Sequence, residues 1–302
     1  MANTIRPRRS VLYMPGSNAR ALEKGRTLAA DALILDLEDA VVPDQKAMAR
    51  QQICDAIGTG GYGMRELLVR VNGFQTVWGY EDLVAVATSG ANGIVLPKVE
   101  SADAIRMAEN VLIKNGAPDD LAIWCMIETP LGVLHAERIA QSTSRTAGFV
   151  MGTSDLAKDV YAAHTTERLP MLYSLTHCLL VARAYGLSIL DGVHLDLSDD
   201  EGFYLSCIQG HELGFDGKTL IHPKTIDKAN EVFAPHAGEI AWSRRIIDEF
   251  SSAQAKGQGV VLVDGKLVEN LHVEAAKRTV ALSEAIERMQ ASTNNGSNAK
   301  VQ

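Results

Sequence analysis

Eight short apolar runs, each as long as a buried strand, recur along the chain and alternate with amphipathic segments of helical length. The runs are SVLYM (10–14), ALILDL (32–37), LLVRV (67–71), GIVLP (93–97), AIWCMIE (122–128), GFVMG (148–152), LSILDGV (187–193) and DGKTLIH (216–222). A strand buried on both faces reads as a continuous apolar run, and strands that alternate with helices are typical of a parallel sheet. Eight such units in about 230 residues have the size of a (β/α)8 barrel.

A doubly wound open sheet is the structural alternative. Such a sheet usually has fewer strands, and no GxGxxG motif follows the first apolar run. The sequence therefore predicts an α/β fold in which residues 1–235 form a (β/α)8 TIM barrel that carries the catalytic residues.

The regular alternation stops after the barrel segment. We expect a helix at about 237–255, then two short strands around a turn at Asp264-Gly265, then a final amphipathic helix. Residues 236–291 are too few for a core of their own, so we expect a C-terminal helical and hairpin arm that acts as a lid or as a subunit contact. Residues 292–302 lack apolar periodicity, which predicts a disordered tail.

Composition narrows the class of protein. The chain is 46% hydrophobic and 22% charged, with a formal net charge of -8, and this acidic balance argues against nucleic-acid binding. No run approaches the ~20 apolar residues of a membrane span, and the basic N-terminus lacks the apolar segment of a signal peptide. The four cysteines show no CxxC spacing and read as free thiols. We expect a cytoplasmic protein that binds neither nucleic acid nor membrane.

One apolar run ends at Glu128, the segment GFVMGTSD that begins with another closes on Asp155, and Glu38 and Asp39 follow a third. The carboxyl ends of barrel strands meet on the face where barrel enzymes have their active sites. Four acids on one face would repel each other without a cation, and Mg²⁺ prefers carboxylate oxygens while it retains several waters. We predict Glu128 and Asp155 as direct metal ligands and Glu38 and Asp39 as ligands through water. The alternative for each acid is an ion pair with a basic side chain on the barrel rim.

Arg70 lies inside the apolar run LLVRV, where an unpaired charge is costly. One interpretation is a structural ion pair with Glu38 or Asp39. The other, which we favour, is a catalytic role in which the guanidinium binds a substrate carboxylate or a developing oxyanion. Tyr13 and Pro97, at the ends of two other strands, are expected to contact the substrate.

Other basic residues give weaker signals. Arg20 and Lys24 are four residues apart on the first helix, and on spacing alone a solvated helix face explains them better than a binding site. Arg8 and Arg9 could form a local phosphate-binding patch. The eight histidines show no HExxH spacing, and neither a GxSxG nor a GxxxxGK[ST] motif is present, which argues against zinc, a serine nucleophile and a phosphate loop.

An ordered set of motifs resembles the citrate lyase β-subunit-like branch of the HpcH/HpaI aldolase superfamily. The motifs are RSVLYMPGSNARALEK, LILDLEDAV, VRVNG, VLPKVES, IETPLG, GTSDLA, DGVHLDLSDDEG and GFDGKTLIHP. The resemblance runs from Arg9 to about Ala285. The C-terminal segment GQGVVLVDGKLVENLHVEAAKR is most similar to malyl-CoA lyases and (3S)-malyl-CoA thioesterases, and less similar to the shorter β subunits of citrate lyase complexes.

This resemblance implies a (β/α)8 barrel, Mg²⁺ with Mn²⁺ as an alternative, a CoA thioester and a 2-oxo acid as small-molecule partners, and a trimeric or hexameric homo-oligomer. By motif, the metal ligands fall on Glu128 and Asp155, and Arg70 falls on the arginine that contacts the reacting acyl group. Arg20 and Lys24 fall near the CoA phosphate contacts, which turns the weak signal into a predicted CoA-binding pair.

The resemblance also implies an acid on the C-terminal lid that reaches into the active site of a neighbouring subunit. That residue is usually an Asp in a motif like IDxP. Here the nearest match is Glu269 in LVENLH, which is one methylene longer and lacks the following Pro. We expect Glu269 to act as a catalytic acid or base, and the choice between C–C cleavage and thioester hydrolysis depends on its geometry.

The expected function is a Mg²⁺-dependent carbon–carbon lyase that cleaves a malyl-CoA-type substrate to acetyl-CoA and glyoxylate, or forms it by a Claisen-type condensation. The first alternative is a (3S)-malyl-CoA thioesterase that gives malate and CoA. Further alternatives are a citramalyl-CoA or methylmalyl-CoA lyase, a pyruvate-dependent aldolase and a non-catalytic CoA-binding subunit.

Overall fold

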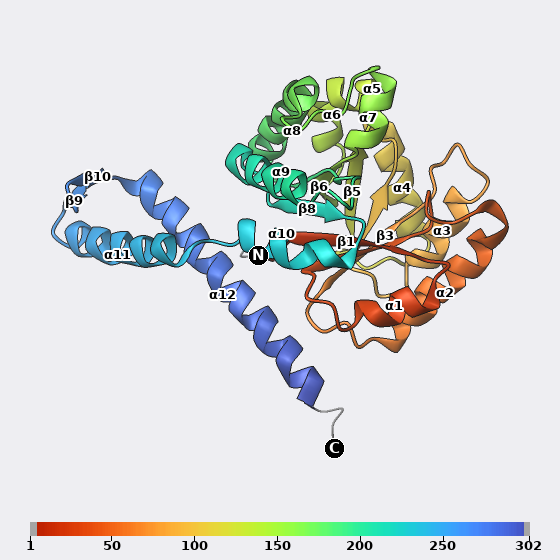
Figure 1. Cartoon of the computed structure of the whole chain (residues 1–302), viewed down its shortest axis with the longest axis horizontal. Coiled ribbons are helices and arrows are strands. Elements are labelled where there is room, and N and C mark those ends of the chain that lie inside the picture. The colour runs from red at the N-terminus through yellow and green to blue at the C-terminus, as the bar shows by residue number, and fades with distance from the viewer. Residues whose placement is uncertain (1–4, 299–302) are drawn as a thin grey trace. The chain divides into compact units, whose positions relative to one another are not determined.

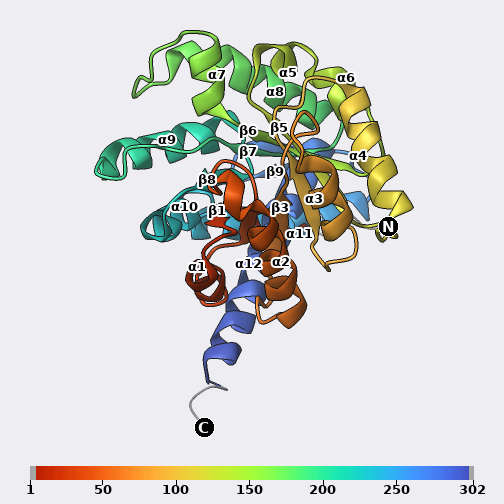
Figure 2. The same ribbon diagram turned by 90° about the vertical axis from the view of Figure 1, so that its right-hand side faces the viewer.

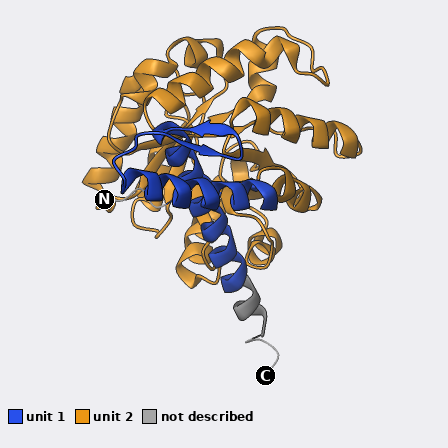
Figure 3. Ribbon diagram, turned by 90° about the vertical axis from the view of Figure 1, so that its left-hand side faces the viewer, with its two compact units in different colours: residues 1–7, 234–302 blue, residues 8–233 orange. Residues whose placement is uncertain are grey.

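The computed structural model describes the backbone of residues 5–298 and the side chains of residues 5–292. The chain divides into two compact units (Figure 3). Unit 2 is residues 8–233, and unit 1 joins residues 1–7 to residues 234–302. The boundary lies close to the one expected after residue 235, but the N-terminal residues group with the C-terminal unit.

Eight parallel strands in unit 2 form a closed barrel (Figure 1). Each strand pairs with its neighbour in sequence order, and β1 pairs with β8 to close the ring. The strands are β1 (Ser10–Pro15), β2 (Ala32–Asp36), β3 (Glu66–Arg70), β4 (Gly93–Leu96), β5 (Ala122–Ile127), β6 (Thr146–Met151), β7 (Ser188–Asp191) and β8 (Gly217–Leu220). All eight apolar runs form these strands, so the predicted TIM barrel is confirmed.

Helices follow the strands and surround them (Figure 2). They are α1 (Ala19–Gly25), α2 (Lys46–Thr59), α3 (Gly79–Val86), α4 (Ala102–Lys114), α5 (Pro130–Leu134), α6 (Ala136–Ala140), α7 (Thr153–Asp159), α8 (Leu172–Ala184), α9 (Asp200–Leu213) and α10 (Ile226–Val232). Short 3₁₀ turns at Pro43–Gln45, Leu169–Met171 and Pro223–Thr225 precede α2, α8 and α10. Among the described helices, none has both the length and the apolar content that a membrane span requires.

Both faces of each barrel strand are buried, which explains why the sequence shows continuous apolar runs. Alternate residues point into the barrel, and those between them pack against the helices. The inner cluster is Val11, Ala32, Ile34, Leu68, Val95, Trp124, Met126, Val150 and Leu190. Trp124 is fully buried, and a Cβ atom on Gly148 would lie 2.4 Å from its ring, so the glycine makes room for the indole.

Two arginines before β1 have structural partners. Arg8 stacks on the Trp124 ring, with its Cζ atom 4.9 Å from the centroid, and forms a two-pronged ion pair with Glu66. Arg9 forms a buried ion pair with Asp31, with 2.8 Å between Nη2 and Oδ1. The phosphate-binding patch considered for Arg8 and Arg9 is therefore wrong, because internal carboxylates already bind both guanidinium groups.

Unit 1 consists of α11 (Ala237–Gln254), a hairpin of β9 (Val261–Val263) and β10 (Lys266–Val268), and α12 (Asn270–Asn298). Asp264 and Gly265 have φ angles of +48° and +75°. Positive φ at both central residues is what a two-residue hairpin turn requires.

This arm has a small apolar cluster of its own, which the sequence analysis did not expect. Helices α11 and α12 and the hairpin pack on each other and bury Ile246, Phe250, Val263, Val268, Val273 and Ala276. Helix α12 continues to Asn298, where a disordered tail was expected from residue 292, because each added residue extends an existing helix by one hydrogen bond. Residues 299–302 lie outside the described residues.

Candidate functional site

A pocket of about 390 Å³ opens among residues at the carboxyl ends of the barrel strands. Tyr13, Asp39, Arg70, Glu128 and Asp155 all line it. The parallel strands β1, β2, β3, β5 and β6 therefore bring five of the residues predicted from the sequence to one place.

Glu128 directly follows β5, and its side chain is buried. The backbone N–H of Lys98 donates a hydrogen bond of 2.7 Å to Glu128 Oε1. A Cβ atom on Gly152, which follows β6, would lie 2.3 Å from Glu128 Cβ, so only a glycine there leaves room for this carboxylate. The end of β6 and the loop after β4 thus fix the position of Glu128.

The two predicted metal ligands have opposite pKa shifts. Burial raises the pKa of Glu128 to about 7 despite the hydrogen bond from Lys98, and the neighbouring Glu38 and Asp155 add to the rise. Burial also works to raise the pKa of Asp155, but the side chains of Lys158 and Lys98 outweigh it, and the pKa is lowered. Asp155 therefore carries its charge more readily than Glu128.

Glu38 lies after β2 with its side chain 13% exposed. Its Oε2 atom is 2.8 Å from Arg70 Nη1, but the N–H group does not point at it, and this buried oxygen has no hydrogen-bond partner. Burial raises the pKa of Glu38 to about 7 in spite of Arg70, with a further contribution from Asp39. Asp39 is more exposed and lies 3.3 Å from Arg70 Nη1.

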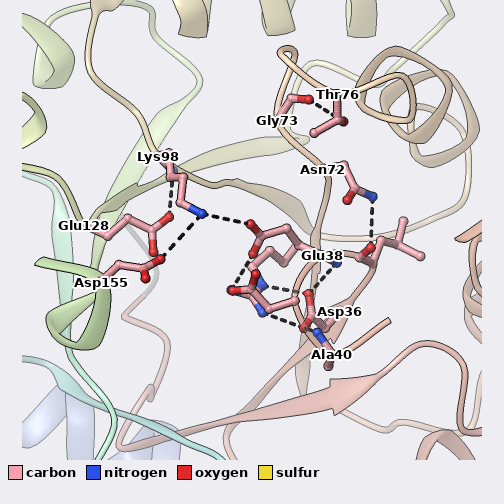
Figure 4. A network of polar contacts seen from close by, with 12 residues as sticks. Asp36, Glu38, Ala40, Asn72, Gly73, Thr76, Lys98, Glu128 and Asp155 are labelled. Atoms are coloured by element: carbon pink, nitrogen blue, oxygen red, sulfur yellow. Dashed lines mark hydrogen bonds and ion pairs between the residues drawn. The ribbon is translucent and has the colours of Figure 1, made fainter. Parts of the chain in front are cut away.

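Lys98 lies among these acids and was not predicted as a site residue (Figure 4). Its ammonium nitrogen is 3.7 Å from Glu38 Oε1 and 3.6 Å from Asp155 Oδ2. Burial opposes the charged form, but Glu38, Glu128 and Asp155 outweigh it and raise the pKa of Lys98. The available signal was its position directly after an apolar strand, in VLPKVES.

Arg70, the last residue of β3, has a partner that the sequence analysis did not name. Its Nε and Nη2 atoms donate to the two carboxylate oxygens of Asp36, at 2.7 and 2.6 Å. Its Cζ atom lies 4.9 Å from the centroid of the Tyr13 ring. Burial opposes the charge on Arg70, but the hydrogen bonds and charge of Asp36 outweigh it and raise the pKa of Arg70. The guanidinium is thus held rigidly at the wall of the pocket.

Tyr13 points from β1 into the same pocket. Burial raises the pKa of its phenol, although Arg70 works in the opposite direction. The hydroxyl therefore stays protonated and can donate a hydrogen bond to a ligand.

A buried lysine supports the loop that carries Glu38. Lys46 Nζ donates to the carbonyl oxygens of Leu37 and Glu38, at 2.7 and 2.8 Å, and to Asn72 Oδ1 at 2.8 Å. Asn72 Nδ2 in turn donates to the Leu37 carbonyl at 2.9 Å and to Asp82 Oδ2 at 2.6 Å. The loop after β2 is therefore fixed by side chains from α2 and from the loop after β3.

The donor set of the pocket fits a hard divalent cation. Glu128 and Asp155 offer carboxylate oxygens to the pocket, and these are the ligands that Mg²⁺ prefers. Glu38 lies close to Asp155, since both contact Lys98 Nζ, but its Oε2 atom is ion-paired with Arg70. In the described part of the chain, no three His, Cys, Asp or Glu side chains are grouped as a complete metal site. An ion held by Glu128 and Asp155 would complete its shell with water or substrate oxygens, as Mg²⁺ commonly does.

The other predicted site residues lie outside the set that lines the pocket. Arg20 and Lys24 are on the exposed side of α1, and Pro97 is buried directly before Lys98. Glu269 follows β10 in unit 1, where its side chain is half-buried and its backbone N–H donates to His272 Nδ1 at 3.0 Å.

Comparisons with known proteins give similarities over nearly the whole chain. Two proteins from Cereibacter sphaeroides, each named (3S)-malyl-CoA thioesterase, are 47% and 49% identical over 292 residues, which is 97% of this chain and 100% of each relative. The citrate lyase subunit beta of Leuconostoc mesenteroides subsp. cremoris is 34% identical over 94% of this chain and 95% of its own.

A solved structure shows the same fold. The protein CitE from Mycobacterium tuberculosis, in complex with magnesium, acetoacetate and coenzyme A, superposes with a TM-score of 0.72 and is 26% identical. The match covers 91% of this chain and 97% of that one. Residues 9–223 match the family described as HpcH/HpaI aldolase/citrate lyase. The chain therefore belongs to the HpcH/HpaI aldolase/citrate lyase family, in the branch that its sequence motifs indicated.

Proposed function

We propose that this protein is a Mg²⁺-dependent enzyme that hydrolyses the thioester of a malyl-CoA-type substrate to malate and free CoA. The observation that supports this most is the pocket in which Glu128 and Asp155 meet beside Arg70, in a chain that matches the full length of relatives named (3S)-malyl-CoA thioesterase. From the sequence alone, C–C cleavage was the expected reaction. These relatives are the reason that we place hydrolysis first.

Glu128 and Asp155 would hold the metal ion, and Glu38 and Asp39 would contact it through water. The charge of the bound ion would attract the carboxylate and hydroxyl oxygens of the malyl group and polarise the group it binds. The magnesium complexes among the similar structures support the choice of metal.

Arg70 would stabilise the negative charge that develops on the substrate during the reaction. Asp36 and the Tyr13 ring hold its guanidinium in one orientation, so little reorganisation accompanies the reaction. The protonated hydroxyl of Tyr13 would donate a hydrogen bond to a substrate oxygen.

In hydrolysis, a water molecule gives up a proton as its oxygen bonds to the thioester carbon. The carbon–sulfur bond then breaks, and the sulfur leaves as the thiol of CoA. We propose Glu269 of a neighbouring subunit as the acid or base for these proton transfers, and Arg20 and Lys24 on exposed α1 as contacts for the CoA phosphates. A homotrimer or homohexamer would supply the neighbouring subunit.

Carbon–carbon cleavage is the second candidate, and the similarity to citrate lyase β subunits favours it. A base would take the proton of the substrate hydroxyl, and the C–C bond would break to glyoxylate and the enolate of acetyl-CoA. Glu269 would then protonate the acetyl carbon. Citramalyl and methylmalyl groups differ from malyl by a methyl group or its position, which changes binding in a pocket by only ~1–3 kcal/mol.

One incubation separates these outcomes. Purified protein is mixed with malyl-CoA and Mg²⁺, and free thiol, malate, glyoxylate and acetyl-CoA are measured. Thiol and malate without glyoxylate support hydrolysis, whereas glyoxylate with acetyl-CoA establishes the lyase. If neither pair forms, or if turnover persists in EDTA and in Glu128→Gln, the metal-dependent function is wrong.

A further inference from the structure

The side chain of Lys98 bridges two of the acids that surround the proposed metal position (Figure 4). Its Nζ atom lies 3.7 Å from Glu38 Oε1 and 3.6 Å from Asp155 Oδ2, and its own backbone N–H is bonded to Glu128 Oε1. One residue thus contacts three carboxylates that come from three different strand ends.

The ammonium and a divalent ion need the same oxygens. An ion held by Glu128 and Asp155 would lie next to Lys98 Nζ, where the two positive charges would repel at short range. The Lys98 side chain is 37% exposed, so it has room to move towards solvent when an ion enters.

The other lysine that contacts Asp155 does not have this position. Lys158 lies 3.3 Å from Asp155 Oδ1, on the opposite carboxylate oxygen, and its side chain is 67% exposed. Its second carboxylate contact is with Asp159 at 3.5 Å rather than with Glu38 or Glu128. Lys158 therefore screens Asp155 from the solvent side, whereas Lys98 bridges the acids inside the site.

We propose that Lys98 is a built-in competitor of the divalent metal. Its ammonium neutralises and holds together Glu38 and Asp155 while the site is empty, and metal binding requires that it leave. The lysine thereby weakens the affinity for metal. This inference rests on the proposed metal-dependent function, because it presumes that an ion binds Glu128 and Asp155.

Substitution of the side chain tests this directly. In Lys98→Met the backbone N–H remains, so the contact that orients Glu128 is preserved while the ammonium is removed. Binding of Mn²⁺ alone is measured by electron paramagnetic resonance, and binding of Mg²⁺ alone by calorimetry. We expect Lys98→Met to tighten both dissociation constants by roughly tenfold or more, since the ion no longer has to displace an ammonium from the carboxylates. Lys98→Arg keeps the charge and should bind metal within about twofold of the wild type.

Lys224→Met is the matched control for net charge. Lys224 also follows a barrel strand, its side chain is 39% exposed, and its Nζ pairs with Asp200 at 2.8 Å without contact to the proposed ligands. Its substitution should leave the metal dissociation constants within about twofold, because its charge lies outside the site.

Thermal unfolding gives a readout that does not depend on catalysis. In EDTA, Lys98→Met should have a lower Tm than the wild type, because the acids lose their counter-ion. Saturating Mg²⁺ should raise the Tm of the variant by more than it raises that of the wild type, since tighter binding to the folded state stabilises it more.

The outcomes are distinguishable. If the wild type binds metal through Glu128, but Lys98→Met binds it equally or more weakly, the competition is disproved and the proposed function stands. If neither protein binds Mn²⁺ or Mg²⁺, the metal-dependent function fails, and the inference fails with it.

Discussion

The acids at this site differ in pKa although they lie close together, because burial and neighbouring charges act differently on each of them. Glu128 and Glu38 are raised to a pKa of about 7 mainly by burial. Asp155 is more exposed, and Lys158 and Lys98 lower its pKa. Groups whose environments separate their pKa values are typical of sites that bind ions or move protons.

The raised pKa values predict how the metal-free protein responds to pH. For Glu128 and Glu38 the folded state binds protons more tightly than the unfolded state, whose ordinary pKa is 4.5. Their contribution to stability is therefore greatest below pH 4.5 and is lost as the pH rises to about 7. Denaturant unfolding in EDTA across this range should show the loss, and Glu128→Gln should reduce it. Equal pH profiles for the variant and the wild type would contradict the assignment.

The affinity for Mg²⁺ should depend on the protonation of the same two carboxylates. It should rise with pH, whereas their contribution to stability falls. As the pH falls below about 7, protons compete with the ion for Glu128 and Glu38, so the affinity for Mg²⁺ should fall. Calorimetric titrations at several pH values would measure it, and an affinity that stays constant from about pH 8 to 5 would contradict the prediction.

Asp36 is the residue that we expect to position the guanidinium of Arg70, through their ion pair. Asp36→Ala leaves a buried guanidinium with only part of its partners, which should cost about 3 kcal/mol of unfolding free energy. It should also lower kcat, because Arg70 loses its fixed orientation, while Mg²⁺ binding changes little.

Asp103→Ala is the control for this substitution. Asp103 forms an exposed i,i+3 pair with Arg106 at 2.8 Å, and loss of such a surface pair should cost less than about 1 kcal/mol. If Asp36→Ala is as mild as Asp103→Ala in denaturant unfolding and in kcat, Asp36 does not position Arg70.

At the scale of elements, burial decided what could be predicted from the sequence. The eight barrel strands were found because both of their faces are buried, and the Asp264-Gly265 hairpin was found because its turn chemistry is local. The acids at strand ends were found because parallel strands deliver them to one face. Lys98 and Asp36 were missed because a lysine after a strand reads as solvated, and because the partner of Arg70 depends on strand register.

The proposed metal site depends on Gly152, which follows β6 and supplies no ligand itself. In Gly152→Ala the new Cβ would lie 2.3 Å from Glu128 Cβ and 2.7 Å from Glu128 Oε2, so the carboxylate must move. A ligand displaced in this way should lower metal affinity and kcat/KM by about a hundredfold. Calorimetry and steady-state kinetics would measure both.

Gly58→Ala provides the comparison for this variant. Nothing lies within 4 Å of a Cβ at Gly58, and alanine favours a helix interior. It should retain wild-type metal binding and kinetics. Wild-type affinity in Gly152→Ala would show that Glu128 is not held by this contact or is not a ligand.

At the scale of the whole molecule, the proposed chemistry is divided between the two compact units. The barrel of unit 2 holds the proposed metal ligands and Arg70, and unit 1 holds Glu269 after its hairpin. Each unit has its own apolar cluster. This division makes the role of Glu269 testable by exchange of subunits.

If Glu269 acts in the site of a neighbouring subunit, two inactive variants should complement each other. Glu269→Gln keeps the barrel ligands, so it should bind Mg²⁺ normally and lose most of its turnover. Glu128→Gln loses a metal ligand but keeps Glu269. In a mixed oligomer, some sites combine the intact Glu128 of one subunit with the intact Glu269 of another, so co-expression of the two variants should restore part of the activity.

Differently tagged subunits would establish by tandem purification that mixed oligomers form. Mixed oligomers without activity would place Glu269 in the site of its own subunit or outside catalysis, and normal turnover by Glu269→Gln alone would exclude it as the acid or base.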